Sequence, residues 1–354
     1  MGLPSINVEF TKAASTAFKR SEKGTVAVIL RDAAENGGFT LTAASQIPAA
    51  LSVDSKAYLA TAFLGYVNPP KKVVVFVEPA DATDLTAGLA YMATQSFDYL
   101  VGPPDISVAE CTAVVAWIKA QREDGKTPKA VLPDTAAGYE GIVNFSASGI
   151  KAGAATYSAA QYCARMAGLL AGTPITISCT FAPLPEVSDI DRLTTAALDA
   201  AIDAGKLVLY YDGEKVVCGR GVNSLIKPTE EQGAEYKKIK IIEAIDLMQG
   251  DIKRIGRNTF IGKYPNSYDN KCVLVTAIHD YLTGLELAGI LKTGSSSVGI
   301  DVDATEAYLQ STGVDTSTMS AQDIKTANTG ASVFLAATVS ILDAIEDITV
   351  KVTF

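Results

Sequence analysis

The residue types that could support catalysis are few, and the search begins with the chain's single histidine, His279. A Ser-His-Asp arrangement would have to use it. Asp280 follows it directly within a predicted helix, and adjacent helical positions do not share a face. Pairs of carboxylates, which serve glycoside hydrolysis, are present, but the sequence sets none of them apart. A lone histidine on a long helix is more often structural, so we expect no catalytic residue and no enzyme activity.

Metal and phosphate sites are equally weakly supported. Asp301 and Asp303 resemble the start of a calcium loop, but Glu306 stands where such a loop needs glycine. Gly219-Arg220-Gly221 follows a predicted hairpin strand and does not open a helix, and no Walker A pattern is present. The cysteines are odd in number and never in CxxC spacing, which favours reduced, buried thiols over disulfides or zinc: Cys111, Cys163, Cys179, Cys218 and Cys272. We expect no cofactor and no metal.

Composition indicates a folded protein with additional apolar surface. Hydrophobic residues make up 48% of the 354 residues, and charged residues only 19%. Such a chain has ample material for two or three folding units. The low charged fraction suggests that some apolar surface is buried against other chains. The net charge of −9 argues against nucleic-acid binding, which needs a basic face.

The first residues carry no targeting signal that we recognise. The opening Met-Gly-Leu-Pro-Ser-Ile lacks the basic and apolar regions of a signal peptide, and Ile6 stands where myristoylation needs Ser or Thr. The most continuous apolar run, 333–342, is too short to cross a bilayer. We expect a protein that is made in the cytoplasm, stays soluble and inserts into no membrane.

The elements that must position any site form an α/β pattern from Thr25 onward. Continuous apolar runs, typical of buried strands, alternate with helical patterns, which predicts a mixed sheet with at least partly parallel strands. Asp54 is the expected N-cap of the first helix. The predicted strands are 26–30, 73–77, 97–101 and 130–132, and the predicted helices are 54–66, 85–92 and 108–121.

The later part of the chain is less regular and richer in helices. A hairpin is predicted over 206–219, with its turn at Asp212-Gly213. Residues 228–233 predict a domain junction. Further strands are predicted at 142–145, 175–181 and 333–342, and further helices at 159–170, 190–202, 236–255, 271–291 and 304–310.

Both ends of the chain alternate apolar and polar residues with the period of a strand. Ile6, Val8 and Phe10 alternate near the start, and residues 348–354 do the same at the end. A lone strand cannot satisfy its backbone hydrogen-bonding groups, so it must join a sheet. Two options are open: the ends complete sheets of their own domains, or they add to sheets of neighbouring copies by β-augmentation.

The sequence resembles the tail sheath proteins of contractile phage tails and phage-tail-like bacteriocins. The likeness is to the short form found in PBSX-type defective prophages and diffocin-like particles of Gram-positive bacteria. It runs along the whole chain and is strongest at the ends. Four segments carry it: GLPSINVEF (2–10), KRSEKGTVA (19–27), FIGKYPNSYDNK (260–271) and LDAIEDITVKVTF (342–354).

The resemblance implies a structural protein that polymerises around a tail tube and contracts to drive the tube through a cell envelope. It implies an α/β outer domain (23–230), a tube-facing α/β inner domain (231–343) and two β-arms (1–22 with its linker, and 344–354). The implied partners are other copies of the chain, the tail tube, and baseplate and terminator proteins. The arm residues that would contact neighbouring copies are Ser5, Ile6, Asn7, Val8, Glu9 and Phe10, and Ile348, Thr349, Val350, Lys351, Val352, Thr353 and Phe354.

Basic residues concentrate in one part of this otherwise acidic chain. They form either a solvated helix face or a patch that docks on an acidic tube or a neighbouring copy. The residues are Lys237, Lys238, Lys240, Lys253, Arg254, Arg257 and Lys263.

The runner-up function is another self-assembling tail, baseplate or shell protein, and the third is a soluble α/β enzyme. As a sheath subunit, the chain would leave the cell as part of a phage tail or tail-like particle.

Overall fold

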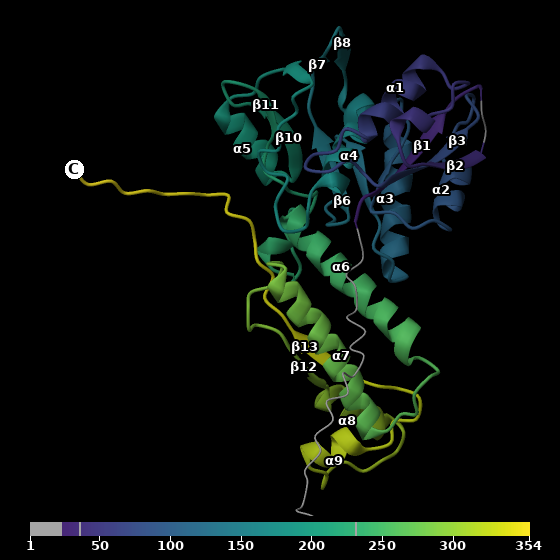
Figure 1. Cartoon of the computed structure of the whole chain (residues 1–354), viewed down its shortest axis with the longest axis vertical. Coiled ribbons are helices and arrows are strands. Elements are labelled where there is room, and N and C mark those ends of the chain that lie inside the picture. Colours follow the sequence, from purple (N-terminus) through teal and green to yellow (C-terminus); the bar gives the residue numbers. More distant parts are fainter. Residues whose placement is uncertain (1–22, 35–36, 231) are drawn as a thin grey trace, which may run out of the picture. The chain divides into compact units, whose positions relative to one another are not determined.

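The structure, a computed structural model, describes residues 23–34, 37–230 and 232–354 (Figure 1). These residues form two compact units. The first contains residues 23–250 together with Ile341–Phe354, and the second is Asp251–Ser340. The division falls inside helix α6 (Ile239–Ile255), so one helix belongs to both units. The predicted N-terminal arm, Ser5–Phe10, lies outside the described residues.

The first unit is built on an eight-stranded sheet with the strand order β11-β10-β6-β5-β4-β1-β3-β2. The inner neighbours are parallel, and only the outermost pairs, β10–β11 and β2–β3, are antiparallel. The predicted mixed α/β fold is therefore confirmed. The strands are β1 (Thr25–Arg31), β2 (Gly37–Leu41), β3 (Lys72–Glu78), β4 (Tyr99–Val101), β5 (Lys129–Pro133), β6 (Ile142–Ser146), β10 (Lys206–Tyr211) and β11 (Val216–Cys218).

Helices cover both faces of this sheet because its strands are apolar on both sides. On β1, Val26 and Val28 belong to one buried cluster, and Ala27 and Ile29 belong to the other, as the two-residue period of a strand requires. Side chains from α1 and α4 complete the first cluster, and side chains from α2 and α3 complete the second. The helices of this unit are α1 (Val53–Ala62), α2 (Thr86–Met92), α3 (Val108–Glu123), α4 (Ala159–Gly172), α5 (Thr195–Asp203) and the short 3-10 turns η1 (Ala44–Gln46) and η2 (Ala234–Lys237).

A second, three-stranded antiparallel sheet was missed from the sequence because each of its strands is only three residues long. Its order is β8-β7-β9. A run of three residues shows too little alternation to be distinguished from a loop. The strands are β7 (Ile150–Ala152), β8 (Ala155–Tyr157) and β9 (Val187–Asp189).

The predicted strand at 175–181 is wrong. The segment consists of turns, closed by local hydrogen bonds from the Ile177 amide to the Pro174 carbonyl (3.1 Å) and from the Ala182 amide to the Cys179 carbonyl (3.0 Å). Phe181, at its end, has a left-handed backbone (φ 60°) that no strand residue adopts. The β-branched alternation here was misleading because the local hydrogen bonds replace a ladder.

Two helix starts also differ from the sequence prediction. Ser52, and not Asp54, caps α1, because the Ser52 hydroxyl accepts the Ser55 amide at 3.2 Å. The helix expected from residue 190 begins only at Thr195. Its N-cap is Thr194, whose hydroxyl accepts the Ala197 amide. In both cases a hydroxyl side chain satisfies an otherwise unpaired helical amide and thereby fixes the start.

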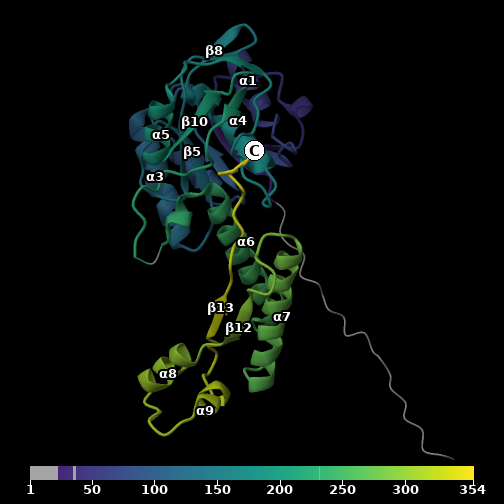
Figure 2. The same cartoon turned by 90° about the vertical axis from the view of Figure 1, so that its left-hand side faces the viewer.

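The second unit continues from the end of α6 into a π-helical turn (η3, Gly256–Phe260) and then α7 (Tyr268–Leu287). A two-stranded antiparallel sheet of β12 (Ser297–Ile300) and β13 (Leu335–Thr338) lies beside α7 (Figure 2). Both long helices are present, but the one predicted at 236–255 starts at Ile239 and the one predicted at 271–291 spans Tyr268–Leu287. The strand predicted over 333–342 is shorter. The remaining helices are α8 (Val302–Ser311) and α9 (Ala321–Thr326).

Candidate functional site

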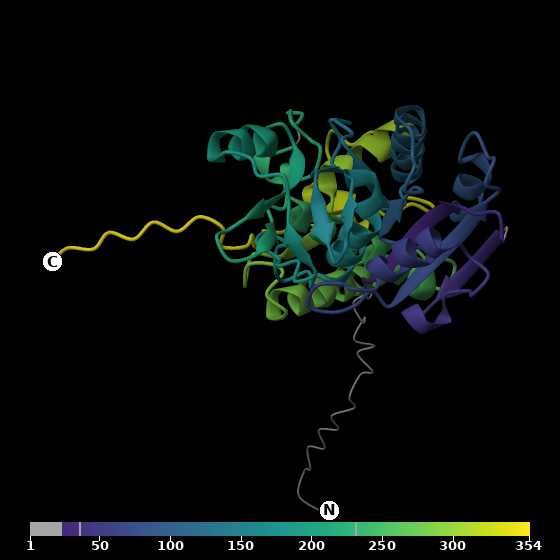
Figure 3. The same ribbon diagram turned by 90° about the horizontal axis from the view of Figure 1, so that it is seen from above.

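Residues 348–354, here called the C-arm, form no strand with any described part of their own chain. In Figure 3 the yellow trace that ends at C runs clear of the sheet and helices of its own unit. Its alternating apolar side chains are open to solvent: Ile348 is 78% exposed, Val350 73% and Val352 78%. The C-arm therefore carries unpaired backbone groups and an unburied apolar face.

The root of the C-arm, in contrast, is fixed by a buried carboxylate. The Glu346 side chain is only 4% exposed. Its Oε1 accepts hydrogen bonds from the Thr180 hydroxyl at 2.6 Å and the Ser178 hydroxyl at 3.2 Å. Its Oε2 lies 3.1 Å from the Lys238 ammonium. A buried carboxylate with this set of partners holds its segment in place, since any displacement leaves it uncompensated.

Further contacts surround Glu346. Together they form what we call the C-clasp, in which residues 342–347 contact Ser178, Thr180, Arg220, Lys238 and Lys240. Lys238 also pairs with Asp343, and Arg220 pairs with Asp347. The Lys240 ammonium donates to the Leu342 carbonyl. Burial lowers the pKa of Lys240. Burial acts in the same direction on Lys238, but its bonds with Asp343 and Glu346 outweigh it and raise the pKa. The C-clasp thus ends at Asp347, immediately before the free C-arm.

The first described residues are fastened to the same helix. The Glu243 carboxylate in α6 accepts hydrogen bonds from the Lys23 ammonium and the Tyr99 hydroxyl, and it is 5% exposed. Lys238 and Lys240, which hold the C-clasp, lie within five residues of it in sequence. The segment that enters the first unit and the segment that leaves it are therefore both fixed at the start of α6.

The β12–β13 sheet has two strands, so each strand has one open edge within the described part of the chain. Its register pairs Ser297 with Thr338 and Ile300 with Leu335. A two-stranded sheet is marginally stable alone, and its outer amides and carbonyls form a template for further strands. This sheet can accept an additional strand on either side.

The segment that precedes each of these strands is held by a side chain from α7 or from the loop just before it. The Glu286 carboxylate accepts the amides of Gly294 and Ser296, both at 2.8 Å, which fixes the turn before β12. The Asn266 side chain donates to the carbonyls of Gly330 (2.8 Å) and Ser332 (3.0 Å), which fixes the chain before β13. These polar contacts position the two open edges.

The resembling segment 260–271 thereby acquires a structural role. Besides Asn266, it supplies Lys271, whose buried ammonium donates to the Ala327 carbonyl at 3.0 Å. Asn270 donates to the Pro265 carbonyl at 2.8 Å and shapes the segment itself. The segment therefore supports the β12–β13 sheet.

The predicted basic cluster is divided between the two units. Lys238 and Lys240 belong to the C-clasp, and Lys240 is 4% exposed. Lys237 is half-buried in the first unit. The other four predicted residues are exposed and lie in the second unit, on the last turns of α6 and beyond: Lys253, Arg254, Arg257 and Lys263.

The residues first considered for chemistry have structural positions. His279 lies on the exposed side of α7. Asp301 caps α8 by accepting the Ala304 amide at 2.9 Å. Arg220, from the glycine-flanked triplet, belongs to the C-clasp. Four cysteines are buried, and Cys272 is half-buried. The described residues contain no metal-binding group of three or more His, Cys, Asp or Glu side chains, and no helix with the length and hydropathy of a membrane span.

Sequence reasoning missed the C-clasp, although a signal was present. The basic stretch 237–240 and the acidic stretch 343–347 have opposite charge and similar length. Their pairing links residues 105 apart, as in the contact between Lys238 and Asp343. Without a contact map, nothing selected this pairing from the other charged stretches of the chain.

A folded body, a clasped but unpaired terminal strand and a small sheet with open edges are typical of subunits that assemble by exchanging strands. Comparison with known proteins identifies the family. The phage tail sheath protein central domain matches residues 78–224, and the phage tail sheath C-terminal domain matches residues 231–354. The chain belongs to the phage tail sheath family and is a structural subunit of a contractile sheath.

Individual proteins similar to this chain support the same family assignment. The chain is 37% identical over 359 aligned positions to the tail sheath protein of Clostridium phage phiCD119, covering 99% of both chains. It is 26% identical to the phage-like element PBSX protein XkdK of Bacillus subtilis, over 63% of this chain and 50% of that protein. The contracted helical sheath of the anti-feeding prophage has the same fold, with a TM-score of 0.74, 16% identity, and coverage of 100% and 99%. The predicted resemblance is confirmed.

Proposed function

We propose that the subunit polymerises by adding its C-arm as an extra strand to the β12–β13 sheet of a neighbouring copy. The observation that carries this proposal is the match between an unpaired, strand-patterned C-arm and a two-stranded sheet with open edges. The predicted N-arm, Ser5–Phe10, would take the other edge in a further copy. Each subunit would then be linked to at least two others.

The expected free energy of association per strand joint is large for a segment of seven residues. Each ladder hydrogen bond contributes about 1 kcal/mol net. Burying the apolar face of the C-arm adds roughly 1.5–3 kcal/mol for each of its large side chains. Repetition around a sheath multiplies this effect, because a subunit held at several joints cannot leave when one opens.

Contraction in this proposal is a rigid-body motion of the folded units while the strand joints persist. The C-clasp keeps each C-arm rooted as its subunit rotates. The extended sheath is a kinetically trapped packing, and its release drives the tail tube through the target envelope. This work requires no catalytic group and no cofactor, and we propose that the chain is not an enzyme.

The proposed organisation keeps the boundaries expected from the sequence, which differ from the two compact units at 231–250 and 341–343. Residues 1–22 form the N-terminal arm and linker, 23–230 the outer domain, 231–343 the inner domain facing the tube, and 344–354 the C-terminal β-arm. The chain is made in the bacterial cytoplasm and leaves as part of a phage tail or tail-like particle. Its other partners are the tail tube and the baseplate and terminator proteins, and it binds neither nucleic acid nor the membrane interior.

Assembly of the isolated chain tests this function directly. We expect the purified protein, concentrated or gently heated, to form tubes of uniform width in negative-stain electron micrographs. Tubes are expected because the joints need only copies of this chain. A monodisperse small oligomer under all conditions tried would contradict the proposal.

We also propose that the exposed cations of the second unit dock on an acidic tube surface. Arg257→Glu combined with Lys263→Glu should weaken binding to purified tubes about tenfold at low salt, a loss of about 1.4 kcal/mol. Co-sedimentation measures the effect, which should shrink as salt rises. Lys151→Glu with Lys215→Glu, two exposed charges of the first unit, is the matched control. Equal binding of both variants would end this docking hypothesis.

A further inference from the structure

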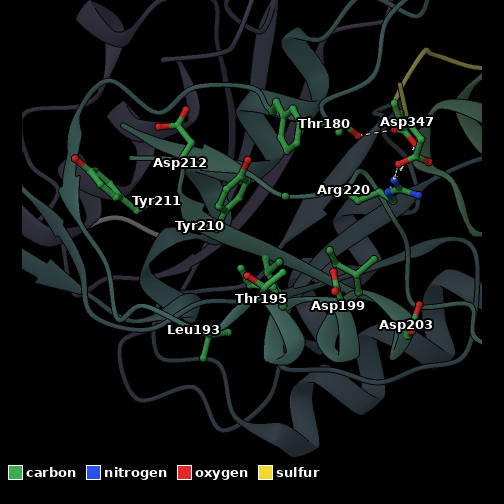
Figure 4. Close-up of a pocket in the computed structure, with 16 residues that line it drawn as sticks. Thr180, Leu193, Thr195, Asp199, Asp203, Tyr210, Tyr211, Asp212, Arg220 and Asp347 are labelled. Atoms are coloured by element: carbon green, nitrogen blue, oxygen red, sulfur yellow. Dashed lines mark hydrogen bonds and ion pairs between the residues drawn. The ribbon is translucent and has the colours of Figure 1, made fainter. Parts of the chain in front are cut away.

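A groove of about 780 Å³ lies in the first unit beside the C-clasp (Figure 4). Its lining includes side chains from α5, β10 and the turn segment that ends at Phe181. Two large apolar side chains at the groove are strongly exposed: Phe181 at 57% and Leu193 at 51%. A surface with such side chains favours an apolar occupant.

The groove is also acidic. Five carboxylates and one guanidinium line it, and the guanidinium, Arg220, is already paired with Asp347. Asp199 and Asp203 are four residues apart on α5 and therefore share one face of that helix. Asp212 follows β10 at the other side of Figure 4. An occupant with a basic side chain would be favoured, and one with a carboxylate would be repelled.

We propose that in the unassembled subunit this groove binds the chain's own C-arm, Ile348–Phe354. This inference rests on the proposed function, because it concerns the same arm before a neighbour takes it. Asp347 lines the groove, and Ile348 follows it directly, so the C-arm starts at the groove's edge. Seven extended residues reach about 23 Å at roughly 3.3 Å per residue. The C-arm is long enough to fold back along the groove.

The two faces of the C-arm match the groove. Its apolar face, with Val350 and Val352, would cover the exposed Phe181 and Leu193. Its other face carries Lys351, the only charged side chain of the C-arm. A lysine ammonium on a long flexible stem can reach the α5 carboxylates at the rim. The predicted N-arm fits less well, because it carries Glu9 and no basic residue between Ser5 and Phe10.

The groove offers no ladder, which keeps this contact reversible. The outer edge of β11 is already occupied, since the Leu184 amide donates to the Val216 carbonyl and the Cys218 amide donates to the Ala182 carbonyl. A C-arm in the groove gains side-chain contacts only. A neighbour's β12–β13 sheet also forms backbone hydrogen bonds with the C-arm, and it therefore binds the C-arm more strongly than the groove does. The folded-back arm would be protected from premature pairing until a growing sheath receives it.

Disulfide trapping in the full-length chain tests this inference. In a Cys272→Ser background, Val352→Cys is combined with Thr195→Cys, a groove position on α5, and the monomer is oxidised at high dilution. We expect an intramolecular cross-link to form about fivefold or more faster than in the pair Val352→Cys with Val108→Cys, because the arm is concentrated at the groove. Val108 is 85% exposed and does not line the groove.

Substitutions of Lys351 test whether its charge draws the C-arm to the acidic groove. Adding Lys351→Glu should slow the cross-link severalfold, and Lys351→Arg should not. Cross-linking no faster than in the control pair would overturn the inference, as would cross-linked dimers at the same dilution, which would assign the groove to another copy's arm. Assembly of the reduced variants is scored separately by electron microscopy. Tubes without the cross-link refute only the fold-back, whereas an absence of tubes in the wild-type chain refutes the proposed function.

Discussion

Deleting residues 348–354 is expected to leave a folded, soluble monomer that forms no tubes. In the described structure these residues bury almost nothing in their own unit, as the 78% exposure of Ile348 and Val352 indicates. Their loss removes at most the reversible side-chain contacts that we propose with the groove, so the melting temperature of the monomer should fall by no more than a few degrees, the shift that about 1 kcal/mol produces. Assembly should fail, because every joint that a C-arm makes loses its strand and the joints proposed for the N-arm cannot close a sheath alone. Sedimentation velocity and negative-stain imaging measure the two effects.

A full-length variant tests whether assembly needs the apolar face of the C-arm or only its length. Val350→Glu with Val352→Glu keeps the backbone but places two charges on the face that a joint would bury. It should assemble as poorly as the deletion. Thr349→Ser with Thr353→Ser alters the opposite face conservatively and should assemble normally. Normal sheaths from the deletion would refute strand exchange through the C-arm.

Replacing Asp246 by alanine should destabilise the first unit by about 3–5 kcal/mol, the usual cost of removing one partner of a buried ion pair. Asp246 is on α6 and is 5% exposed. The Arg122 guanidinium binds it in a fork, at 2.8 and 3.0 Å, and the Lys129 ammonium lies 2.9 Å away. Alanine would leave the buried Lys129 and the largely buried Arg122 uncompensated. Urea unfolding followed by circular dichroism measures the loss.

Asp189→Ala is the matched control, because Asp189 also contacts two cations, Lys151 and Arg192, but in solvent. Its unfolding midpoint should stay within the error of the measurement, since exposed ion pairs contribute little. If Asp246→Ala unfolded at the same urea concentration as wild type, the network around α6 would not be a stabilising element. This comparison also tests whether α6 is a firm anchor for both ends of the chain.

That anchoring matters for a contractile subunit. Lys23 and the C-clasp both attach near the start of α6, and Asp246 ties the same helix to β5 and α3 through Lys129 and Arg122. A force that arrives along either arm would reach the eight-stranded sheet through buried ion pairs.

The sequence by itself determined the α/β body and the two long helices. These features repeat with a period of 2 or about 3.6 residues, and such periods are set by which side chains must be buried. The hairpin at 206–219 was equally predictable from its Asp-Gly turn. The family resemblance was readable for the same reason, since arms and supporting segments are continuous stretches.

The tertiary structure alone decided which charged stretches meet. The contacts of Asp246 with Arg122 and Lys129 join residues 124 and 117 positions apart, and that of Glu346 with Ser178 joins residues 168 apart. Ion pairs over such separations leave no periodic trace, because any cation can serve any carboxylate until the fold excludes the others. The sequence likewise did not show that residues 175–181 form turns. Their local hydrogen bonds replace the strand that the alternating pattern predicted. The pattern of buried side chains within a helix or strand can be read from the sequence, whereas the partners of charged side chains depend on the folded structure.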